Sequence, residues 1–178
     1  AEDSWDSLHI FFSTSNGSVR RNALSDFSNV RANGKIAIKL QPETSLVDVK
    51  ICSENDDIMI ATSEGKAIRF NVSDVRVFKG RESSGVRGIK LSKNDQVVSM
   101  SILTNVTASS NERLAFTKMS RSDNHTDTVN YDVSESNNET DELVLSTERF
   151  KELQSSEQWI LMITSGGFGK RSSAYEYR

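Results

Sequence analysis

Two seven-residue segments with one shared pattern constrain the fold of this chain more than any other feature. Residues 34–40 read Gly-Lys-Ile-Ala-Ile-Lys-Leu and residues 85–91 read Gly-Val-Arg-Gly-Ile-Lys-Leu, so their starts lie 51 positions apart. A repeat of about fifty residues is too small to bury a core alone, and such repeats stack on their neighbours in propellers and solenoids. The sequence therefore predicts a repeat architecture in which successive units cover one another.

A second pattern recurs three times and predicts β-hairpins over residues 9–22, 58–70 and 159–171. Strand-forming residues stand on both sides of three turn glycines, Gly17, Gly65 and Gly167. Asparagine and glycine tolerate the positive φ of a tight turn, which suits the Ser-Asn-Gly and Ser-Gly-Gly turns found here. An arginine follows each glycine four positions later, at Arg21, Arg69 and Arg171. An acid follows each arginine five positions later, at Asp26, Asp74 and Glu176.

Further strand candidates follow the first two hairpins and set the predicted fold class. They lie at residues 36–40, 46–52, 88–91 and 96–102, and four short strands per repeat is the content of a propeller blade. We predict an all-β, propeller-like fold with about two four-stranded blades and the start of a third. The expected divisions are a first blade at 1–52, a second blade at 53–102, an insertion at 103–157 and a truncated third blade, its opening hairpin only, at 158–178.

Residues 103–157 are expected to be an acidic insertion. They carry eleven acids against five bases, whereas the rest of the chain carries fourteen acids and seventeen bases. The overall net charge of −3 therefore hides a mildly basic remainder. Because Ser, Thr, Asn, Asp and Glu crowd out apolar residues there, we expect the insertion to be mobile at least in part. Short helices are predicted within it at 111–119 and 146–154.

The sequence offers little that could carry catalysis or bind a metal. His9 opens a predicted strand and His125 lies in the insertion, too far apart in sequence and character to suggest a metal pair. The single cysteine, Cys52, favours a reducing compartment. No apolar run approaches the ~20 residues of a membrane span, and the chain begins without the pattern of a signal peptide. A cytoplasmic protein with no membrane partner is expected.

Lysines and arginines at matching positions of the repeats predict that the chain binds DNA. If the repeats stack around an axis, equivalent positions fall on one rim and form a basic track for the phosphates of a duplex. The candidate DNA-binding residues are Arg20, Arg21, Arg31, Lys35, Lys39, Lys66, Arg69, Arg76, Arg81, Arg87, Lys90, Lys170 and Arg171. The predicted turn glycines are Gly17, Gly34, Gly65, Gly85, Gly88 and Gly167. Those beside Arg87 would let backbone amides approach a phosphate closely.

Two other interpretations of the cations stay open. Solvated strand faces carry lysine and arginine without any function. The three recurring arginines could instead pair within the protein, each with the acid that follows it five positions later, as ion pairs that fix a blade.

These repeats resemble the C-terminal domain of the DNA gyrase A subunit. The resemblance rests on residues 16–21, 34–40, 64–70, 85–91, 169–171 and 176–178, and it covers nearly all of the chain outside 103–157. It implies a β-pinwheel whose basic rim wraps duplex DNA through sequence-independent phosphate contacts. It also implies two interior blades and the opening hairpin of the next blade.

The resemblance further implies partners and limits. The expected partners are double-stranded DNA, the gyrase B subunit and the remainder of the gyrase A subunit. The two subunits are expected to form a nucleoid-associated A2B2 assembly that introduces negative supercoils. ATP and magnesium belong to other parts of that enzyme, and no cofactor is expected here. The family's Gln-Arg-Arg-Gly-Gly-Lys-Gly box does not occur in the sequence, and Tyr131, Tyr175 and Tyr177 are not candidates for the cleavage nucleophile. The segment by itself is therefore expected to be non-catalytic. Two alternatives are the equivalent domain of topoisomerase IV and a propeller-type protein interaction module that docks partners through strand edges and the insertion.

Overall fold

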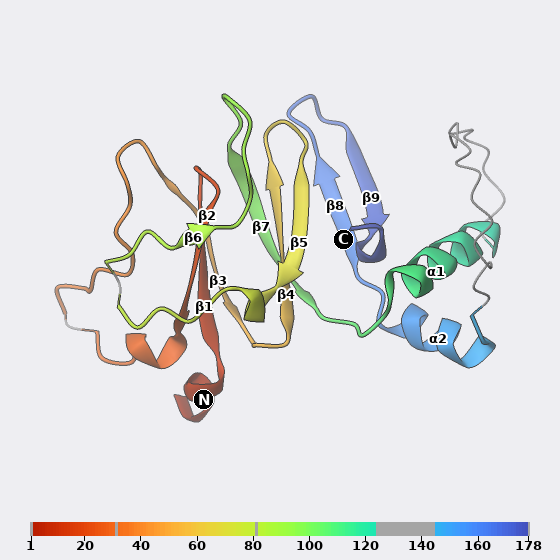
Figure 1. The fold of residues 1–178 in the computed structure, drawn as a ribbon, viewed down its shortest axis with the longest axis horizontal. Helices are drawn as coiled ribbons and strands as arrows, with labels where there is room; N and C mark the ends of the chain where they lie inside the picture. The colour runs from red at the N-terminus through yellow and green to blue at the C-terminus, as the bar shows by residue number, and fades with distance from the viewer. Residues whose placement is uncertain (1, 31, 81, 124–144, 178) are drawn as a thin grey trace. The chain divides into compact units, whose positions relative to one another are not determined.

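The computed structural model describes residues 2–30, 32–80, 82–123 and 145–177 (Figure 1). The chain divides into two compact units, called here the N-terminal unit (1–105) and the C-terminal unit (106–178). Antiparallel sheets form most of the regular structure, which confirms the all-β prediction. Within the described residues, no helix is both long enough and apolar enough to cross a bilayer.

The first sheet is built around the first predicted hairpin. A 3-10 helix, η1 (Glu2–Ser7), leads into β1 (His9–Thr14) and β2 (Ser18–Ala23), which pair antiparallel. The turn closes as Gly17 N donates to Thr14 O over 3.0 Å, and Gly17 has φ +82°. A short 3-10 helix, η2 (Leu24–Phe27), follows. The sheet order is β3-β1-β2-β6, with β3 at Leu46–Cys52 and β6 at Val86–Arg87.

The second sheet repeats this plan with one strand fewer among the described residues. β4 (Asp56–Thr62) and β5 (Ala67–Asn71) form its hairpin, and β7 (Val97–Thr104) pairs with β4 in the order β5-β4-β7. The 3-10 helix η3 (Val72–Asp74) follows β5, as η2 follows β2. β6 comes from the second repeat in sequence but completes the first sheet.

Two predicted strands differ from the structure. Residues 36–40 are not in a strand, and the strand expected at 88–91 is instead the shorter β6 at Val86–Arg87. A single strand needs a partner edge, and β6 finds one on β2. Within the described residues, no hairpin edge pairs with 36–40, which explains why the same sequence pattern gives a strand in one repeat only.

The core of the N-terminal unit joins both sheets. Phe11, Ile58, Ile60 and Val72 have no exposed surface, and Val19 and Val97 pack into the same cluster. The first two predicted blades therefore share one hydrophobic core. Burial of this kind is the main stabilising contribution, at about 25 cal/mol per Å² of apolar surface.

The C-terminal unit combines two helices with the third hairpin. It contains α1 (Ser110–Asp123), α2 (Thr147–Ser155), β8 (Trp159–Ile163), β9 (Gly169–Ser173) and the 3-10 helix η4 (Ala174–Glu176). Both predicted helices are confirmed, and the hydroxyl of Ser146 caps α2 by accepting from Arg149 N. Phe116, Leu153 and Tyr175 form its core. The predicted mobility of the insertion falls partly on residues 124–144, which lie outside the described residues.

Candidate nucleic-acid interface

Arg20 lies inside the N-terminal unit, not on a surface. Its side chain has no exposed area, and its guanidinium donates to Ser83 O at 2.9 Å and to Gly80 O. The next-but-one residue on β2, Asn22, also donates to Phe78 O at 2.6 Å. These side chains fasten the linker after η3 to the outer edge of β2.

Arg21 is also buried and is shared between several acceptors. It donates to Val72 O at 3.0 Å, contacts His9 Nε2 at 2.8 Å and forms an ion pair with Glu54 at 3.1 Å. Burial, followed by the charge of Arg21, lowers the pKa of His9 below its ordinary value of 6.5. A neutral His9 can accept the hydrogen bond, so Arg21 is held at the base of the first hairpin.

Arg69 makes the corresponding contact in the second hairpin. Its Nη2 lies 2.7 Å and its Nε 2.8 Å from Asp57 Oδ2, and both side chains are buried. Asn105 Nδ2 donates to the other carboxylate oxygen of Asp57 at 2.8 Å. The interaction is a two-point, charge-assisted pair, which is among the stronger kinds of hydrogen bond in proteins.

These positions revise the predicted DNA-binding set. Arg20, Arg21 and Arg69 are buried and bonded to protein acceptors, so phosphate has no direct access to them in this structure. The alternative of internal pairing holds for Arg21 and Arg69, but the predicted partners were wrong. Asp74 instead accepts from Asn71 N at 3.1 Å, where it caps η3. Glu176, the predicted partner of Arg171, pairs with Arg121 at 3.4 Å.

Gly85 and Gly88 allow the linker of the second repeat to pack closely against β2 of the first repeat; this contact is called here the joint between the repeats. A Cβ on Gly85 would lie 2.1 Å from Val19 O, and one on Gly88 would lie 2.6 Å from Val19 Cγ1. Gly88 N also donates to Gly17 O over 2.9 Å. Only glycine lets the linker approach β2 this closely. The amide of Gly85 donates to Ser83 Oγ at 3.1 Å, so both amides that were expected to face phosphate are bonded within the protein. Gly34, Gly65 and Gly167 have φ of +82°, +84° and +83°.

Exposed cations gather at the turn end of the N-terminal unit. The two hairpin turns and the loop before β7 lie at one end of this unit (Figure 1). Lys39 lines a small hollow with Asn16 and Ser18 of the first turn, and Arg87 stands opposite Ser18 in the register of β2 and β6. Lys90 follows Ile89, whose N donates to Gly17 O at 3.2 Å. All three cations are exposed.

The second turn adds a cation that is partly compensated. Lys66 donates to Ser92 Oγ, and its Nζ lies 4.0 Å from Asp95. Burial opposes ionisation of Asp95, but hydrogen bonds outweigh it and hold the pKa of this carboxyl below its ordinary value. Lys93, exposed in the same loop, was missed by the sequence reasoning because it has no counterpart in the other repeat. A group of this composition can bind a polyanion without reading its sequence.

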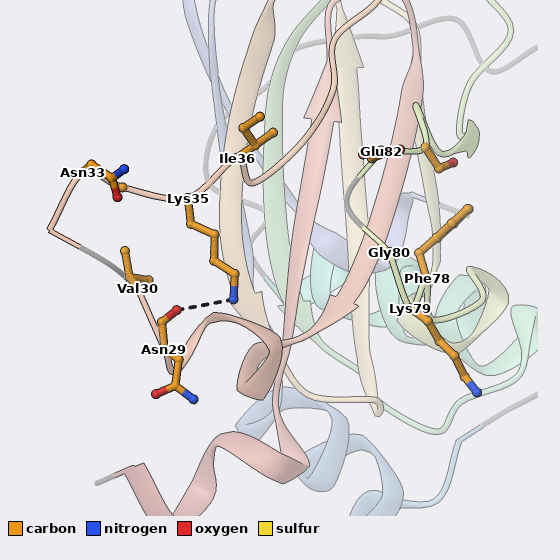
Figure 2. A pocket seen from close by; sticks show the side chains of 11 residues that line it. Asn29, Val30, Asn33, Lys35, Ile36, Phe78, Lys79, Gly80 and Glu82 are labelled. Carbon is orange, nitrogen blue, oxygen red and sulfur yellow. Dashed lines mark hydrogen bonds between the residues drawn. The ribbon is translucent and has the colours of Figure 1, made fainter.

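The remaining cations of the N-terminal unit lie elsewhere. A cavity of about 1070 Å³ is lined by residues 29–30, 33–36, 78–80 and 82–83, including Lys35 and Lys79 (Figure 2). Lys35 Nζ donates to Asn29 O and to Asp26 O, the latter at 2.8 Å. The guanidinium of Arg76 lies 4.0 Å from the centre of the Phe78 ring. Lys35 and Lys79, which line this cavity, are not counted among the exposed cations at the turn end.

The other candidates fall in the C-terminal unit or outside the described residues. Lys170 and Arg171 are exposed on β9, and Arg171 lies 4.3 Å from the centre of the Trp159 ring. Arg31 and Arg81 lie outside the described residues. In the part of the chain that the structure describes, no three histidine, cysteine or acidic residues cluster as they would around a metal.

The fold and its surface define a class. Antiparallel sheets repeat along the chain, a linker from one repeat completes the sheet of the previous one, and cations crowd the turn end. This is a β-propeller-type repeat domain. The sequence model of a family described as "DNA gyrase C-terminal domain, beta-propeller" matches residues 8–53, 56–104 and 158–178. The chain belongs to this family.

Individual relatives agree with that assignment. The chain is 44% identical over 187 residues to the DNA gyrase A subunit of Granulibacter bethesdensis, covering 99% of this chain and 20% of the relative. It is 44% identical over 177 residues to the DNA gyrase A subunit of Rickettsia bellii, covering 99% and 19%. The chain thus spans about a fifth of the length of the curated relatives it matches.

Solved structures give the same picture of the fold. The C-terminal domain of DNA topoisomerase IV matches with a TM-score of 0.52 and 27% identity, covering 56% of this chain and 31% of that one. The DNA gyrase A C-terminal domain matches with a TM-score of 0.51 and 27% identity, covering 58% and 33%.

Proposed function

We propose that this chain is a non-catalytic segment of a gyrase A subunit that binds and wraps duplex DNA. The observation that supports this most is the turn-end group of the N-terminal unit, which is made of exposed cations from both repeats, namely Lys39, Lys66, Arg87, Lys90 and Lys93. The proposed phosphate contacts are Lys39, Lys66, Arg87 and Lys90. Contacts of this kind neutralise phosphates and release counterions, so they give affinity without sequence preference.

The remaining candidate cations have secondary roles in this proposal. Lys170 and Arg171 of β9 would bind phosphate on the C-terminal unit, and Arg31 and Arg81 stay candidates. Lys35 and Lys79 line the cavity and Arg76 lies over the Phe78 ring, so these three cations are not proposed as primary contacts. The proposed partners beyond DNA are the gyrase B subunit, with the rest of the gyrase A subunit, in an A2B2 assembly at the nucleoid. ATP and magnesium would act in other parts of that enzyme.

Sequence similarity, but not fold similarity, distinguishes between gyrase and topoisomerase IV as the parent enzyme of this segment. The topoisomerase IV and gyrase domains match the fold almost equally, with TM-scores of 0.52 and 0.51. The sequence relatives reported above are gyrase A subunits. The sequence comparison therefore favours a gyrase segment.

Binding of a random-sequence duplex at two salt concentrations tests the proposal. Four phosphate contacts give a slope of about −3.6 in log affinity against log salt, or about a hundredfold loss between 50 and 200 mM. Replacing Lys39, Lys66, Arg87 and Lys90 by alanine should remove most of this binding. A control variant with alanine at Lys50 and Lys151, which are exposed elsewhere, should bind like the original chain. Absence of binding at 50 mM, or no effect of salt, would contradict the proposal.

A further inference from the structure

The turn of the second hairpin and the loop before β7 are joined at one buried carboxylate. Asp95 Oδ1 accepts from the backbone N of Glu64 at 3.1 Å and from Ser63 Oγ, also at 3.1 Å. It further accepts from the backbone N of Gln96 at 2.9 Å. The side chain of Asp95 has no exposed area. One oxygen atom therefore connects the hairpin turn to residues 92–96, called here the second loop.

The first repeat has a loop of the same shape at residues 41–45, called here the first loop. Each loop contains a four-residue turn, at 41–44 and at 92–95, in which the last backbone N donates to the first carbonyl oxygen over 3.2 Å and 3.3 Å. The third residue of each turn has a positive φ, +58° at Glu43 and +71° at Asn94. Two tight turns of similar geometry therefore lie at the same place in both repeats.

A serine of each hairpin turn binds the loop of its own repeat. Ser15 N donates to Ser45 O at 2.9 Å, and Ser15 Oγ accepts from Ser45 N at 3.0 Å. Ser63 N donates to Gln96 O at 2.8 Å, and Ser63 Oγ accepts from Gln96 N at 3.2 Å. Both loops thus have the same two hydrogen bonds to a turn serine, and Asp95 adds its own bonds in the second repeat.

The position of Asp95 is occupied by a threonine in the first repeat. Thr44 Oγ1 donates to Pro42 O at 3.4 Å, within the first loop itself. The second residue of the four-residue turn is Pro42 in the first loop and the exposed Lys93 in the second. The repeat whose loop carries a cation at its tip is therefore the repeat in which a buried carboxylate holds that loop.

Lys66 contacts the same carboxylate from the hairpin side. Its ammonium donates to Ser92 Oγ and lies 4.0 Å from Asp95 Oδ2. Lys66 follows the turn glycine of the second hairpin, and Lys93 follows Ser92 in the second loop. Asp95 therefore links the segments that carry both lysines. A loop and a side chain that are ordered before a ligand arrives lose less conformational freedom when they bind it.

We propose that Asp95 is a positioning residue of the DNA interface and that Lys93 is a fifth phosphate contact. Asp95 holds the second loop on the hairpin turn, so Lys93 and Lys66 bind the same stretch of duplex together. The carboxylate is buried and does not itself face phosphate. This inference rests on the proposed function, because it adds a contact and a positioning residue to the same turn-end group.

Salt-dependent binding of a random-sequence duplex tests the contact. Five phosphate contacts give a slope of about −4.5 in log affinity against log salt, compared with about −3.6 for four. Lys93→Ala should therefore make the slope less steep by about 1. An unchanged slope in Lys93→Ala would overturn the role of Lys93 while leaving the other four contacts in place.

Substitution of Asp95 separates positioning from charge. Asp95→Ala removes a negative charge, which alone would tighten DNA binding, but it also releases the second loop. We expect weaker binding at about 50 mM salt and a slope less steep by about 1 to 2. Asp95→Asn retains an acceptor oxygen and should bind at least as tightly as the original chain. Asp26→Ala, which removes an exposed acid of η2, is the control for charge and should bind no more weakly than the original chain.

Ser63→Ala provides a second test that leaves the charge unchanged. It removes the hydroxyl that donates to Asp95 and accepts from Gln96 N, so it should weaken DNA binding as Asp95→Ala does. Binding by Asp95→Ala as tight as that of the original chain, or binding by Asp95→Asn as weak as that of Asp95→Ala, would overturn the positioning role. Unchanged binding by Ser63→Ala would overturn it even if Asp95→Ala does not fold.

Amide hydrogen exchange tests the role of Asp95 without DNA. The amides of Glu64 and Gln96 should exchange faster in Asp95→Ala and at the original rate in Asp95→Asn. Unchanged exchange in Asp95→Ala would overturn the positioning role even if the chain binds DNA. If the original chain does not bind duplex at about 50 mM salt, the proposed function fails and the Lys93 contact with it. The exchange rates would still show whether Asp95 holds the second loop.

Discussion

The side chains of Arg69 and Asp57 meet diagonally across the two strands of the second hairpin, with Nη2 and Oδ2 2.7 Å apart and both side chains 3% exposed. The same two positions of the first hairpin hold Arg21 and His9, 2.8 Å apart. The acid that pairs with the arginine stands at a different position in each repeat. In the first repeat this acid is Glu54, and the corresponding position of the second repeat holds Asn105. Each hairpin base thus retains a hydrogen-bonded arginine with one nearby acid.

Removing either partner of the Arg69 pair should strongly destabilise the N-terminal unit. Arg69→Ala leaves the Asp57 carboxylate buried without its counter-charge, and such losses cost about 3–5 kcal/mol. Urea unfolding followed by circular dichroism measures the change. Arg171→Ala is the matched control, because its guanidinium is exposed over Trp159 and such a contact contributes about 0.5–1 kcal/mol. Equal losses for the two variants would contradict the assignment.

Gly85→Ala should disrupt the joint between the repeats. The added methyl group would lie 2.1 Å from Val19 O. Gly65→Ala meets the same unfavourable φ, at +84°, in open space. We expect Gly85→Ala to cost about 1–3 kcal/mol more than Gly65→Ala, because only the first also overpacks its surroundings. Thermal unfolding of both variants gives the comparison, and similar melting temperatures would argue against the close approach.

The stability of the N-terminal unit should fall as pH drops below about 6.5. The pKa of His9 is lowered in the folded chain by burial and by Arg21, with Glu54 acting in the opposite direction. The unfolded chain therefore takes up a proton that the folded chain resists, and the loss continues until the folded pKa is reached. Above the unfolded value the contribution is constant. His9→Gln should remove this part of the pH dependence in urea titrations between about pH 5 and 8. An unchanged pH profile in His9→Gln would exclude His9 as its source.

Tyr175→Phe should weaken the C-terminal unit. The hydroxyl of Tyr175 donates to Leu153 O over 3.0 Å in a buried setting, and the Tyr175 ring lies edge-on to Phe116 with centroids 5.2 Å apart. Loss of the hydroxyl leaves a buried carbonyl without this donor, at a cost of about 1–3 kcal/mol. Tyr177→Phe serves as control, since its hydroxyl is exposed and lies 3.5 Å from Met162 Sδ. The difference should appear in the loss of helical signal on heating.

Part of this structure could be predicted because turn chemistry is local. The positive φ of Gly17, Gly65 and Gly167 closes three hairpins that the sequence pattern identifies. The helices at 110–123 and 147–155 also follow from their local signals.

The roles of the recurring arginines could not be predicted from the same information. A repeated position shows that a side chain is needed but not which side of the sheet it faces, and buried arginine is uncommon. Arg69 pairs with Asp57, twelve residues away on the facing strand, because strand register brings them together. Sequence proximity instead suggested Asp74, which caps the following turn.

The strand at Val86–Arg87 reaches β2 only after the entire second hairpin has been made. During synthesis, the first hairpin therefore leaves the ribosome with an open edge, and it keeps that edge until the linker behind the next hairpin emerges. Such an interval exposes a nascent chain to wrong partners, including the same hairpin on a neighbouring polysome. The order in which repeats are translated thus sets when each sheet becomes protected.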